Sequence, residues 1–159
     1  MISSNMKKFV LLICVVGLSL SSCSKDEPIS FQEQLEADGV AIDGYLAANN
    51  ISAQTDPSGL RYVITSLGTG AKPTLDKSIK VKYKGMLLSN GQIFDQANSA
   101  VVFKLNNLIQ GWKIGFQLMP TGSKATLYIP SGLAYGAQAT GSIPPNSNLI
   151  FEVELFEVI

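Results

Sequence analysis

The residues that could carry chemistry are mostly aromatic and aliphatic, and they are grouped in short motifs between residues 83 and 151. The motifs are Tyr83-Lys84-Gly85-Met86-Leu87, Phe94-Asp95, Leu108-Ile109-Gln110-Gly111-Trp112, Ala134-Tyr135-Gly136, Ile143-Pro144-Pro145 and Phe151. Aromatic side chains dominate protein cores, so each motif taken singly is typical of a core. Such residues offer burial and exclusion of water, and Asp95 is the only carboxylate in the set.

The chain has no histidine, and this absence excludes several kinds of enzyme. A Ser-His-Asp or Cys-His catalytic relay needs an imidazole, and so does a histidine-ligated zinc, iron or copper site. We therefore expect neither a metal nor another cofactor. The 12 lysine and arginine residues balance 12 aspartate and glutamate residues. Because nucleic-acid binding depends on clustered positive charge, we expect no nucleic-acid partner.

The first 23 residues indicate export and a lipid anchor. Lys7 and Lys8 precede an apolar run from Phe9 to Leu20, which has the length of a signal-peptide core and is too short to span a bilayer. The following Ser21-Ser22-Cys23 resembles the end of a bacterial lipobox, whose cysteine receives lipid. The alternative, a secretory signal with an incidental cysteine, would leave an unpaired thiol in an oxidising compartment. We predict a lipoprotein signal peptide over residues 1–22 and lipidation of Cys23.

Residues 23–56 are predicted to form a lipidated tether and a short helix. Ser30 and Glu33 have the spacing of a capping box, and apolar residues recur at helical spacing beyond them. Gly39 and Gly44 weaken this helix by about 1 kcal/mol each relative to alanine, so it must pack on something. We interpret it as a docking helix or spacer, with a dimerisation arm as the alternative. A turn cluster then marks the start of the next unit, residues 57–159.

From Leu60 onward the hydrophobic pattern alternates. Apolar and polar residues take turns at residues 79–84, 124–129 and 151–155, as in antiparallel strands that bury one face and leave the other in water. The lysines of the first segment could pair across strands with Glu152 and Glu154. Such exposed pairs contribute little, so we interpret them as solvated surface.

Two further signals complete the predicted fold. Asn90-Gly91 predicts a hairpin turn after the first strand. A single helical pattern is expected to begin at Asn106 or Asn107, to include Trp112 and to end at Pro120. One apolar helix against one half-buried sheet predicts an α+β domain.

The motifs, taken in order, resemble those of the FKBP-type peptidyl-prolyl cis-trans isomerases. The agreement covers Y-x-G-M-L, F-D, I-x-G-W, A-Y-G and I-P-P, across about residues 60–159. The resemblance implies a curled antiparallel sheet wrapped around one short helix, here preceded by the N-terminal helix. It also implies a pocket between helix and sheet with Trp112 as its floor.

The resemblance assigns roles to individual residues. The implied catalytic residues are Tyr83, Phe94, Asp95, Ile109, Trp112, Tyr135 and Phe151, and the implied substrate-binding residues are Val101, Leu108 and Ile143. In the family, the backbone amide at the Ile109 position and the hydroxyl at the Tyr135 position donate hydrogen bonds to ligand carbonyls. Val101 stands at a wall position that is often aromatic in the family.

Prolyl isomerisation suits a site without histidine. Rotation about an X-Pro bond breaks no covalent bond and requires only that amide resonance be lost, with a barrier of ~18–20 kcal/mol. The twisted amide is less polar than the planar one, so a pocket that excludes water favours it. Useful turnover needs a reduction of only about 3–7 kcal/mol.

Asp95 allows two interpretations. Its charge or hydrogen bond could tune a neighbouring tyrosine and the bound amide. Alternatively, as a buried carboxylate that must be partnered, it could brace the pocket wall. Comparing Asp95→Asn and Asp95→Leu separates the two.

The sequence thus predicts a peptidyl-prolyl cis-trans isomerase that assists folding in the bacterial cell envelope, lipid-anchored at the periplasmic face or in the outer membrane. Its predicted partners are proline-containing unfolded or exported polypeptides, the membrane through the anchor, and macrolide ligands of the family. We expect a monomer. The alternative from another class is a chaperone or binding module on the same fold with little turnover. A third is an envelope interaction protein whose partner contacts the helix at residues 31–46.

Overall fold

The computed structural model describes residues 30–159. The predictions for the signal peptide, Cys23 and the tether before residue 30 lie outside the described residues. The elements follow in the order α1 (Phe31–Ala48), β1 (Gln54–Thr55), β2 (Arg61–Ser66), β3 (Ser78–Leu87), β4 (Ile93–Lys104), the 3₁₀ helix η1 (Leu105–Asn107), α2 (Gln110–Leu118), β5 (Lys124–Ile129), the 3₁₀ helix η2 (Ser131–Leu133) and β6 (Leu149–Val158).

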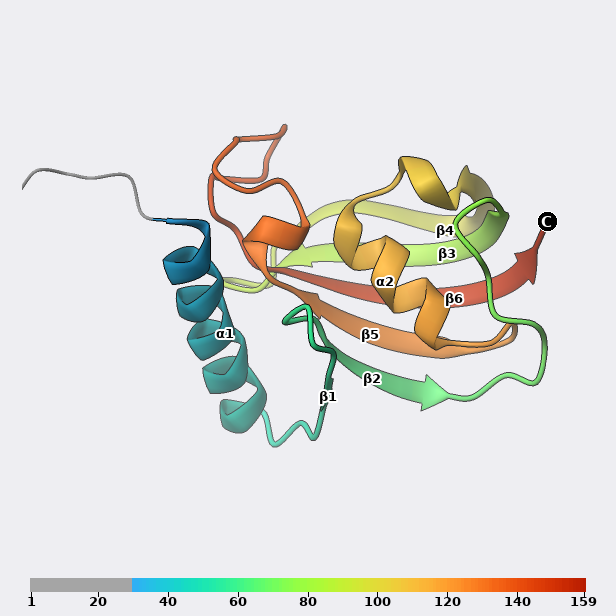
Figure 1. Cartoon of the computed structure of the whole chain (residues 1–159), viewed down its shortest axis with the longest axis horizontal. Helices are drawn as coiled ribbons and strands as arrows, with labels where there is room; N and C mark the ends of the chain where they lie inside the picture. Colours follow the sequence, from blue (N-terminus) through green and yellow to red (C-terminus); the bar gives the residue numbers. More distant parts are fainter. Residues whose placement is uncertain (1–29) are drawn as a thin grey trace, which may run out of the picture.

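The six strands form one curled antiparallel sheet in the order β1-β2-β5-β6-β3-β4. Helix α2 lies across one face of the sheet, and α1 stands beside one end of it (Figure 1). The main core fills the space between α2 and the sheet, with Phe116, Leu127 and Leu149 fully buried. The predicted α+β fold, a curled sheet around one short helix with a helix before it, is confirmed.

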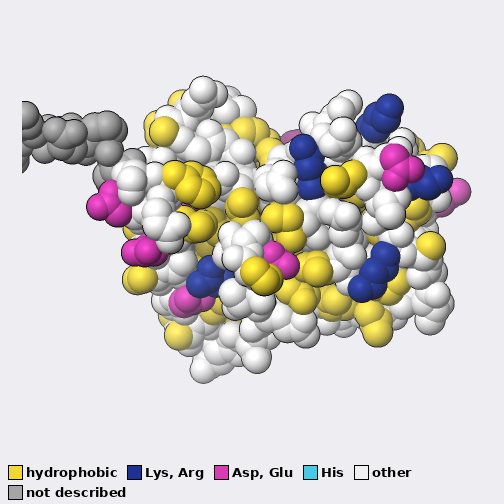
Figure 2. All heavy atoms as spheres, viewed as in Figure 1, with side chains coloured by type: hydrophobic (Ala, Val, Ile, Leu, Met, Phe, Trp, Pro, Cys, Tyr) yellow, Lys and Arg dark blue, Asp and Glu magenta, His cyan; other side chains and the backbone are white. Residues whose placement is uncertain are grey.

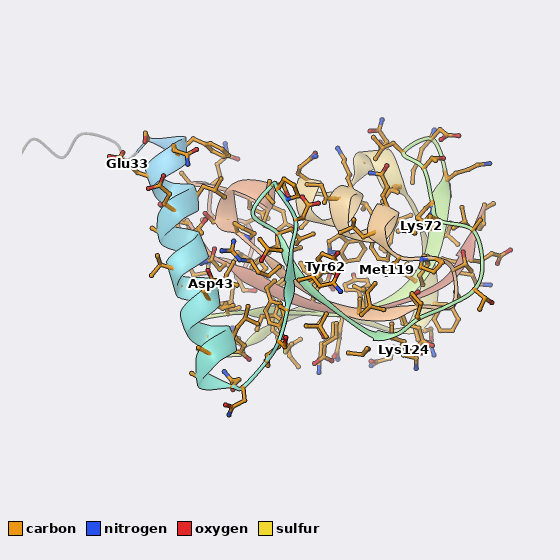
Figure 3. All side chains as sticks on the ribbon, turned by 60° about the horizontal axis from the view of Figure 1, so that its bottom comes forward. Glu33, Asp43, Tyr62, Lys72, Met119 and Lys124 are labelled. Carbon is orange, nitrogen blue, oxygen red and sulfur yellow. The ribbon has the colours of Figure 1, made fainter. Side chains whose placement is uncertain are left out.

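Helix α1 begins as its sequence predicts. The Ser30 hydroxyl accepts a hydrogen bond from the Glu33 amide at 3.2 Å, and the Glu33 carboxylate accepts one from the Ser30 amide at 2.9 Å. This reciprocal capping box satisfies two amides that no helical carbonyl can reach. Figure 3 shows Glu33 at this end of the helix.

Helix α1 covers part of the outer face of the sheet. Ile42 and Leu46 of α1 form a second apolar cluster with Tyr128 of β5 and Ile150 of β6. Tyr128 is only 4% exposed, although the alternating pattern places it on the solvated face. That prediction is wrong at this end of the sheet because α1 covers it.

Helix α2 begins later than expected. Asn106 belongs to η1, and α2 begins at Gln110 with Ile109 as the residue that precedes it. Leu108 and Ile109 are therefore in extended backbone between the two helical segments, and neither Asn106 nor Asn107 caps α2. The predicted end before Pro120 is correct, since the last helical residue is Leu118.

The turn between β3 and β4 contains Asn90-Gly91, as predicted, but is longer than a two-residue hairpin. Only Gly91 has a positive φ, of 71°, while the Asn90 side chain accepts a hydrogen bond from the Gln92 amide at 2.9 Å. Strand β4 then runs along the free edge of the sheet for 12 residues.

Charged side chains are dispersed on the face of the molecule that Figure 2 shows. There, acidic and basic side chains are scattered among apolar ones and form no continuous patch of one sign. Among residues 30–159, no helix has the length and apolar character needed to cross a membrane.

Candidate active site

An apolar pocket of about 180 Å³ opens between α2, the sheet and the segment after η2. Its lining residues are Tyr83, Phe94, Asp95, Phe103, Leu108, Ile109, Trp112, Tyr135 and Phe151. The structure thus brings together eight of the predicted residues from five separate parts of the chain.

Trp112 forms the floor and is in edge-to-face contact with several rings. Its ring centroid lies 5.2 Å from that of Tyr83, 5.1 Å from Phe116 and 5.1 Å from Phe151. Such contacts hold the indole in one orientation. Within residues 30–159, its Nε1 is the only buried side-chain polar atom without a hydrogen-bond partner. An unpaired buried donor is costly, so this position is not optimised for stability alone.

Two glycines let α2 approach the sheet closely enough to place Trp112. A Cβ on Gly111 would lie 2.4 Å from Cγ2 of Ile129, and one on Gly115 would lie 2.7 Å from Cδ1 of Leu127. Neither buried partner has room to retreat. The Gly-Trp pair is therefore a packing requirement as well as a motif.

Gly85 has the same function on β3. A Cβ there would lie 2.7 Å from both Phe94 and Phe151. The absence of a side chain lets these two rings meet edge to face, with centroids 5.5 Å apart. The wall opposite α2 is thereby closed by aromatic rings.

Asp95 lies at the pocket rim and is exposed, which corrects the expectation of a buried carboxylate. Its Oδ2 accepts a hydrogen bond from the Tyr83 hydroxyl at 2.6 Å. Burial, the hydrogen bond to Asp95 and the charge of Asp95 together raise the pKa of Tyr83 to about 12. Burial, and then the same charge, also raise the pKa of Tyr135. Neither shift changes the protonation state at neutral pH, because a tyrosine hydroxyl with its ordinary pKa of about 10 is already protonated there and can donate.

Two donors at the pocket remain free. Among residues 30–159, no group accepts a hydrogen bond from the Ile109 amide or from the Tyr135 hydroxyl. Ile109 directly precedes α2, and its carbonyl already accepts from the Trp112 amide at 3.0 Å. The arrangement offers an apolar cavity with two hydrogen-bond donors and no pair of acidic and basic groups.

The remaining predicted residues lie elsewhere. Ile143 lines an adjoining hollow of about 230 Å³, which shares Phe94, Asp95 and Tyr135 with the main pocket. Val101 packs at the edge of the core and does not line either hollow. The aromatic wall residue in its place is Phe103, with its ring centroid 6.1 Å from that of Trp112.

Phe103 was missed for a geometric reason. It lies two residues after Val101 and points to the same side of β4, opposite Ile79, while Val101 lies opposite Val81. Alternation alone cannot choose between them. The longer side chain of Phe103 reaches the pocket. Its size is the only feature of the sequence that favours Phe103 over Val101 as the wall residue.

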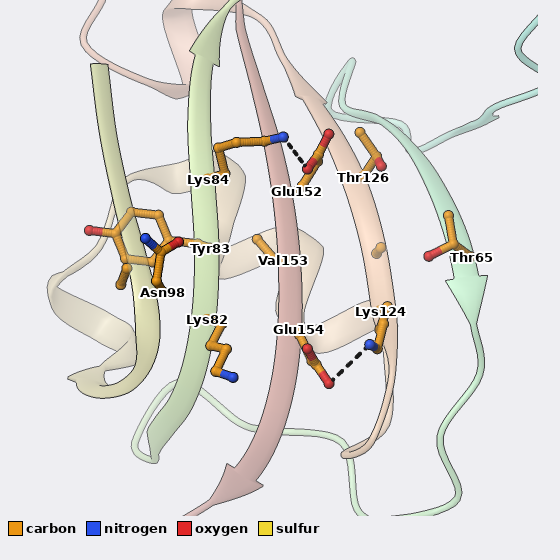
Figure 4. A pocket seen from close by; sticks show the side chains of 12 residues that line it. Thr65, Lys82, Tyr83, Lys84, Asn98, Lys124, Thr126, Glu152, Val153 and Glu154 are labelled. Atoms are coloured by element: carbon orange, nitrogen blue, oxygen red, sulfur yellow. Dashed lines mark ion pairs between the residues drawn. The ribbon is translucent and has the colours of Figure 1, made fainter. Parts of the chain in front are cut away.

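A larger hollow of about 490 Å³ lies on the outer face of the sheet, over β5, β6 and β3 (Figure 4). Lys84 bridges Glu152 at 2.7 Å, and Lys124 bridges Glu154 at 3.3 Å. Lys82 is opposite Glu154 in register, but its Nζ lies 5.3 Å from the Phe156 ring centroid. This open, ion-paired surface does not exclude water, so we assign the site to the smaller aromatic pocket.

No cluster of three or more possible metal-ligating side chains exists among the described residues.

Comparisons with known proteins agree with this geometry. Residues 69–156 match the family described as FKBP-type peptidyl-prolyl cis-trans isomerase. The chain is 40% identical over 144 residues to FkpA of Aeromonas hydrophila, with 84% of this chain and 53% of that protein covered. It is 37% identical over 134 residues to the outer membrane protein MIP of Legionella longbeachae, with 80% of this chain and 57% of that protein covered. The chain spans about half the length of the curated relatives it matches.

Solved structures show the same architecture. A peptidyl-prolyl cis-trans isomerase of Pseudomonas syringae superimposes with a TM-score of 0.70 at 35% identity, over 83% of this chain and 98% of that one. FkpA of Escherichia coli gives a TM-score of 0.68 at 32% identity, over 80% of this chain and 63% of that one.

Proposed function

The chain belongs to the FKBP-type peptidyl-prolyl cis-trans isomerase family, and on that premise we propose that it catalyses rotation about X-Pro bonds in unfolded polypeptides. The observation that carries the proposal is the aromatic pocket with two donors, the Ile109 amide and the Tyr135 hydroxyl, which have no acceptor within residues 30–159. This arrangement suits a reaction in which no covalent bond is broken.

The pocket acts by favouring the twisted amide. The planar X-Pro amide is polar and well hydrated, whereas the twisted amide has lost resonance and part of its dipole. A proline ring above Trp112, among the rings of Phe94 and Phe151, would leave water behind as it enters. The pocket thereby destabilises the planar form relative to the transition state.

The two donors orient the substrate. The Ile109 amide and the Tyr135 hydroxyl would each donate to a substrate carbonyl and so hold the chain while the amide turns. Asp95 would keep the Tyr83 ring in place through the 2.6 Å hydrogen bond. Phe103 and Leu108 would contact the residue before proline, with Ile143 in the adjoining hollow.

The protein would work in the cell envelope on exported polypeptides. The apolar run before Cys23 supports export, and the Ser21-Ser22-Cys23 sequence supports lipidation of Cys23. One relative is named as an outer membrane protein, which fits the same compartment. Palmitate labelling of the chain made in a bacterium tests the anchor: incorporation that survives Cys23→Ser would contradict it.

A protease-coupled assay with a proline-containing peptide tests the activity. We expect turnover that falls about 3- to 10-fold in Tyr135→Phe, because one net hydrogen bond is lost, and much further in Trp112→Ala. Tyr45→Phe is the matched control, since it removes the hydroxyl of an α1 tyrosine outside the pocket.

The same protein sample distinguishes an isomerase from a chaperone or binding module. Absence of turnover, together with suppressed aggregation of an unfolded client protein, would reject the isomerase and support a binding module. Retained turnover in Trp112→Ala would contradict the assignment of the pocket.

A further inference from the structure

A buried carboxylate joins α1 to the segment that carries Tyr135. Asp38 is 2% exposed, and its Oδ2 accepts hydrogen bonds from the Ser131 amide at 2.8 Å and from the Ser131 hydroxyl at 2.6 Å. Its Oδ1 accepts from the Gln34 side chain at 2.8 Å. Asp38 lies outside residues 69–156, the part of the chain that matches the family model.

The partner of Asp38 is directly connected to the pocket. Ser131 is the first residue of η2, and Tyr135 lies two residues beyond the end of that short helix. The Ser131 carbonyl accepts hydrogen bonds from the Ala134 amide at 3.0 Å and from the Gly136 amide at 2.9 Å. Tyr135 is therefore held on both sides by amides that bond to Ser131. A displacement of Ser131 would displace the Tyr135 hydroxyl.

Helix α1 also contacts the same segment through Phe31, which is 64% exposed. The Phe31 ring packs so closely on Gly132 that a Cβ there would lie 2.7 Å from its Cε2. Figure 1 shows the start of α1 beside this short helix.

The packing of α1 on the sheet does not by itself require a carboxylate at position 38. Helix α1 already has an apolar contact through Ile42 and Leu46, and an ion pair between Asp43 and Arg61 at 2.7 Å. Burying a further charge costs free energy, and an apolar side chain of similar size would dock a helix as well. A carboxylate adds directed bonds to the Ser131 amide, which also donates to Asn148 Oδ1 at 3.0 Å, and to the Ser131 hydroxyl. Such bonds fix position.

We infer that Asp38 is a positioning residue for prolyl isomerisation, which holds the Tyr135 hydroxyl at the pocket through Ser131. Asp38 thereby links α1 to the site, although it lies outside residues 69–156, which match the family model. The inference rests on the proposed function.

A double-mutant cycle on the full-length protein in detergent tests it. We expect Asp38→Ala to lower kcat/KM about 3- to 10-fold in the parent and less than about 2-fold in a Tyr135→Phe background, because the hydroxyl it positions is then absent. Asp38→Asn, which keeps an oxygen acceptor for Ser131, should restore most of the activity.

Asp43→Ala is the matched control. It removes the other carboxylate that joins α1 to the rest of the chain, five positions along the same helix, but its partner Arg61 lies on β2. Figure 3 shows Asp43 on α1. We expect its kcat/KM to stay within about 2-fold of the parent in both backgrounds. If Asp38→Ala does not fold, Ser131→Ala replaces it, since that change removes only the hydroxyl partner.

Three activity results would overturn the inference: an equal loss from Asp38→Ala in both backgrounds, no loss in the parent, or an equal loss from Asp43→Ala. A parent protein without turnover rejects the proposed function. Hydrogen exchange then tests whether Asp38 positions the segment that carries Tyr135. Faster exchange at residues 131–136 in Asp38→Ala than in Asp43→Ala supports it, and unchanged exchange overturns it.

Discussion

The close approach of α2 to β5 allows a sharp test with one methyl group. Gly111→Ala places a Cβ 2.4 Å from Cγ2, 2.8 Å from Cδ1 and 3.0 Å from Cγ1 of Ile129. All three atoms belong to one fully buried side chain, so Ile129 cannot swing away. Helix α2 must therefore move outward, and Trp112, the next residue, moves with it.

The expected magnitude follows from two opposing effects. Overpacking of a well-filled core costs about 1–3 kcal/mol. Replacing glycine by alanine in a helix returns up to about 1 kcal/mol, and less near the start of the helix, where Gly111 lies. We expect a net loss of about 1–2 kcal/mol in the free energy of unfolding. Because the pocket floor is displaced, kcat/KM should also fall.

A second glycine provides a control in which the change in the free energy of unfolding has the opposite sign. Gly44 lies inside α1 with no atom within 4 Å of an added Cβ. Gly44→Ala should therefore raise the free energy of unfolding by about 0.5–1 kcal/mol and leave kcat/KM unchanged. Urea unfolding followed by circular dichroism measures both changes.

Rescue at the contact makes the test specific. Ile129→Ala removes all three atoms that the new methyl group would meet, so Gly111→Ala should cost much less in that background. Stabilisation by Gly111→Ala similar to that of Gly44→Ala would refute the packing argument, and so would an unchanged cost in the Ile129→Ala background.

Three further predictions follow from the pocket. Burial is the largest cause of the raised Tyr83 pKa, followed by the hydrogen bond to Asp95 and its charge, so in Asp95→Asn and Asp95→Leu an ultraviolet titration should show that pKa falling from about 12 only part of the way towards 10.0. Loss of activity in both variants at an unchanged melting temperature would contradict a purely bracing role. The folded protein holds the Tyr83 proton more tightly than the unfolded chain, so this contribution to stability is complete below pH 10.0 and is lost as pH rises through about 12. Urea unfolding should show a smaller alkaline loss in Tyr83→Phe, and an equal loss would exclude this contribution. Phe103→Ala should raise the KM for proline peptides several-fold, while Val101→Ala should change only stability; the reverse result would restore Val101 as the wall residue.

Much of the fold follows from local patterns in the sequence. The capping box at Ser30 and Glu33 depends on residues three apart, and both hydrogen bonds are present. The alternation around Val81 and the end of α2 before Pro120 are local as well, and both were predicted correctly. The start of α2 was not, because Asn106 and Asn107 are taken up by a separate 3₁₀ helix before Ile109.

The site was predictable as a set of residues but not as a geometry. Eight of the ten residues that the family resemblance assigns do line the main pocket. The choice between Val101 and Phe103 depends on which side chain reaches Trp112, and alternation treats both alike. Asp95 was expected to be buried, but it is exposed at the pocket rim on the edge strand β4. Which strand forms the edge of the sheet is decided by the tertiary structure.

The sequence by itself established which kinds of catalysis are excluded and which family the chain resembles. The absence of histidine excludes imidazole relays, and the ordered aromatic motifs indicate an isomerase pocket. Only the tertiary structure showed that α1 covers Tyr128 and that Asp38 bonds to Ser131, 93 positions along the chain. The physical reason is that periodicity reports contacts between near neighbours, whereas a buried carboxylate has no partner until distant segments pack together.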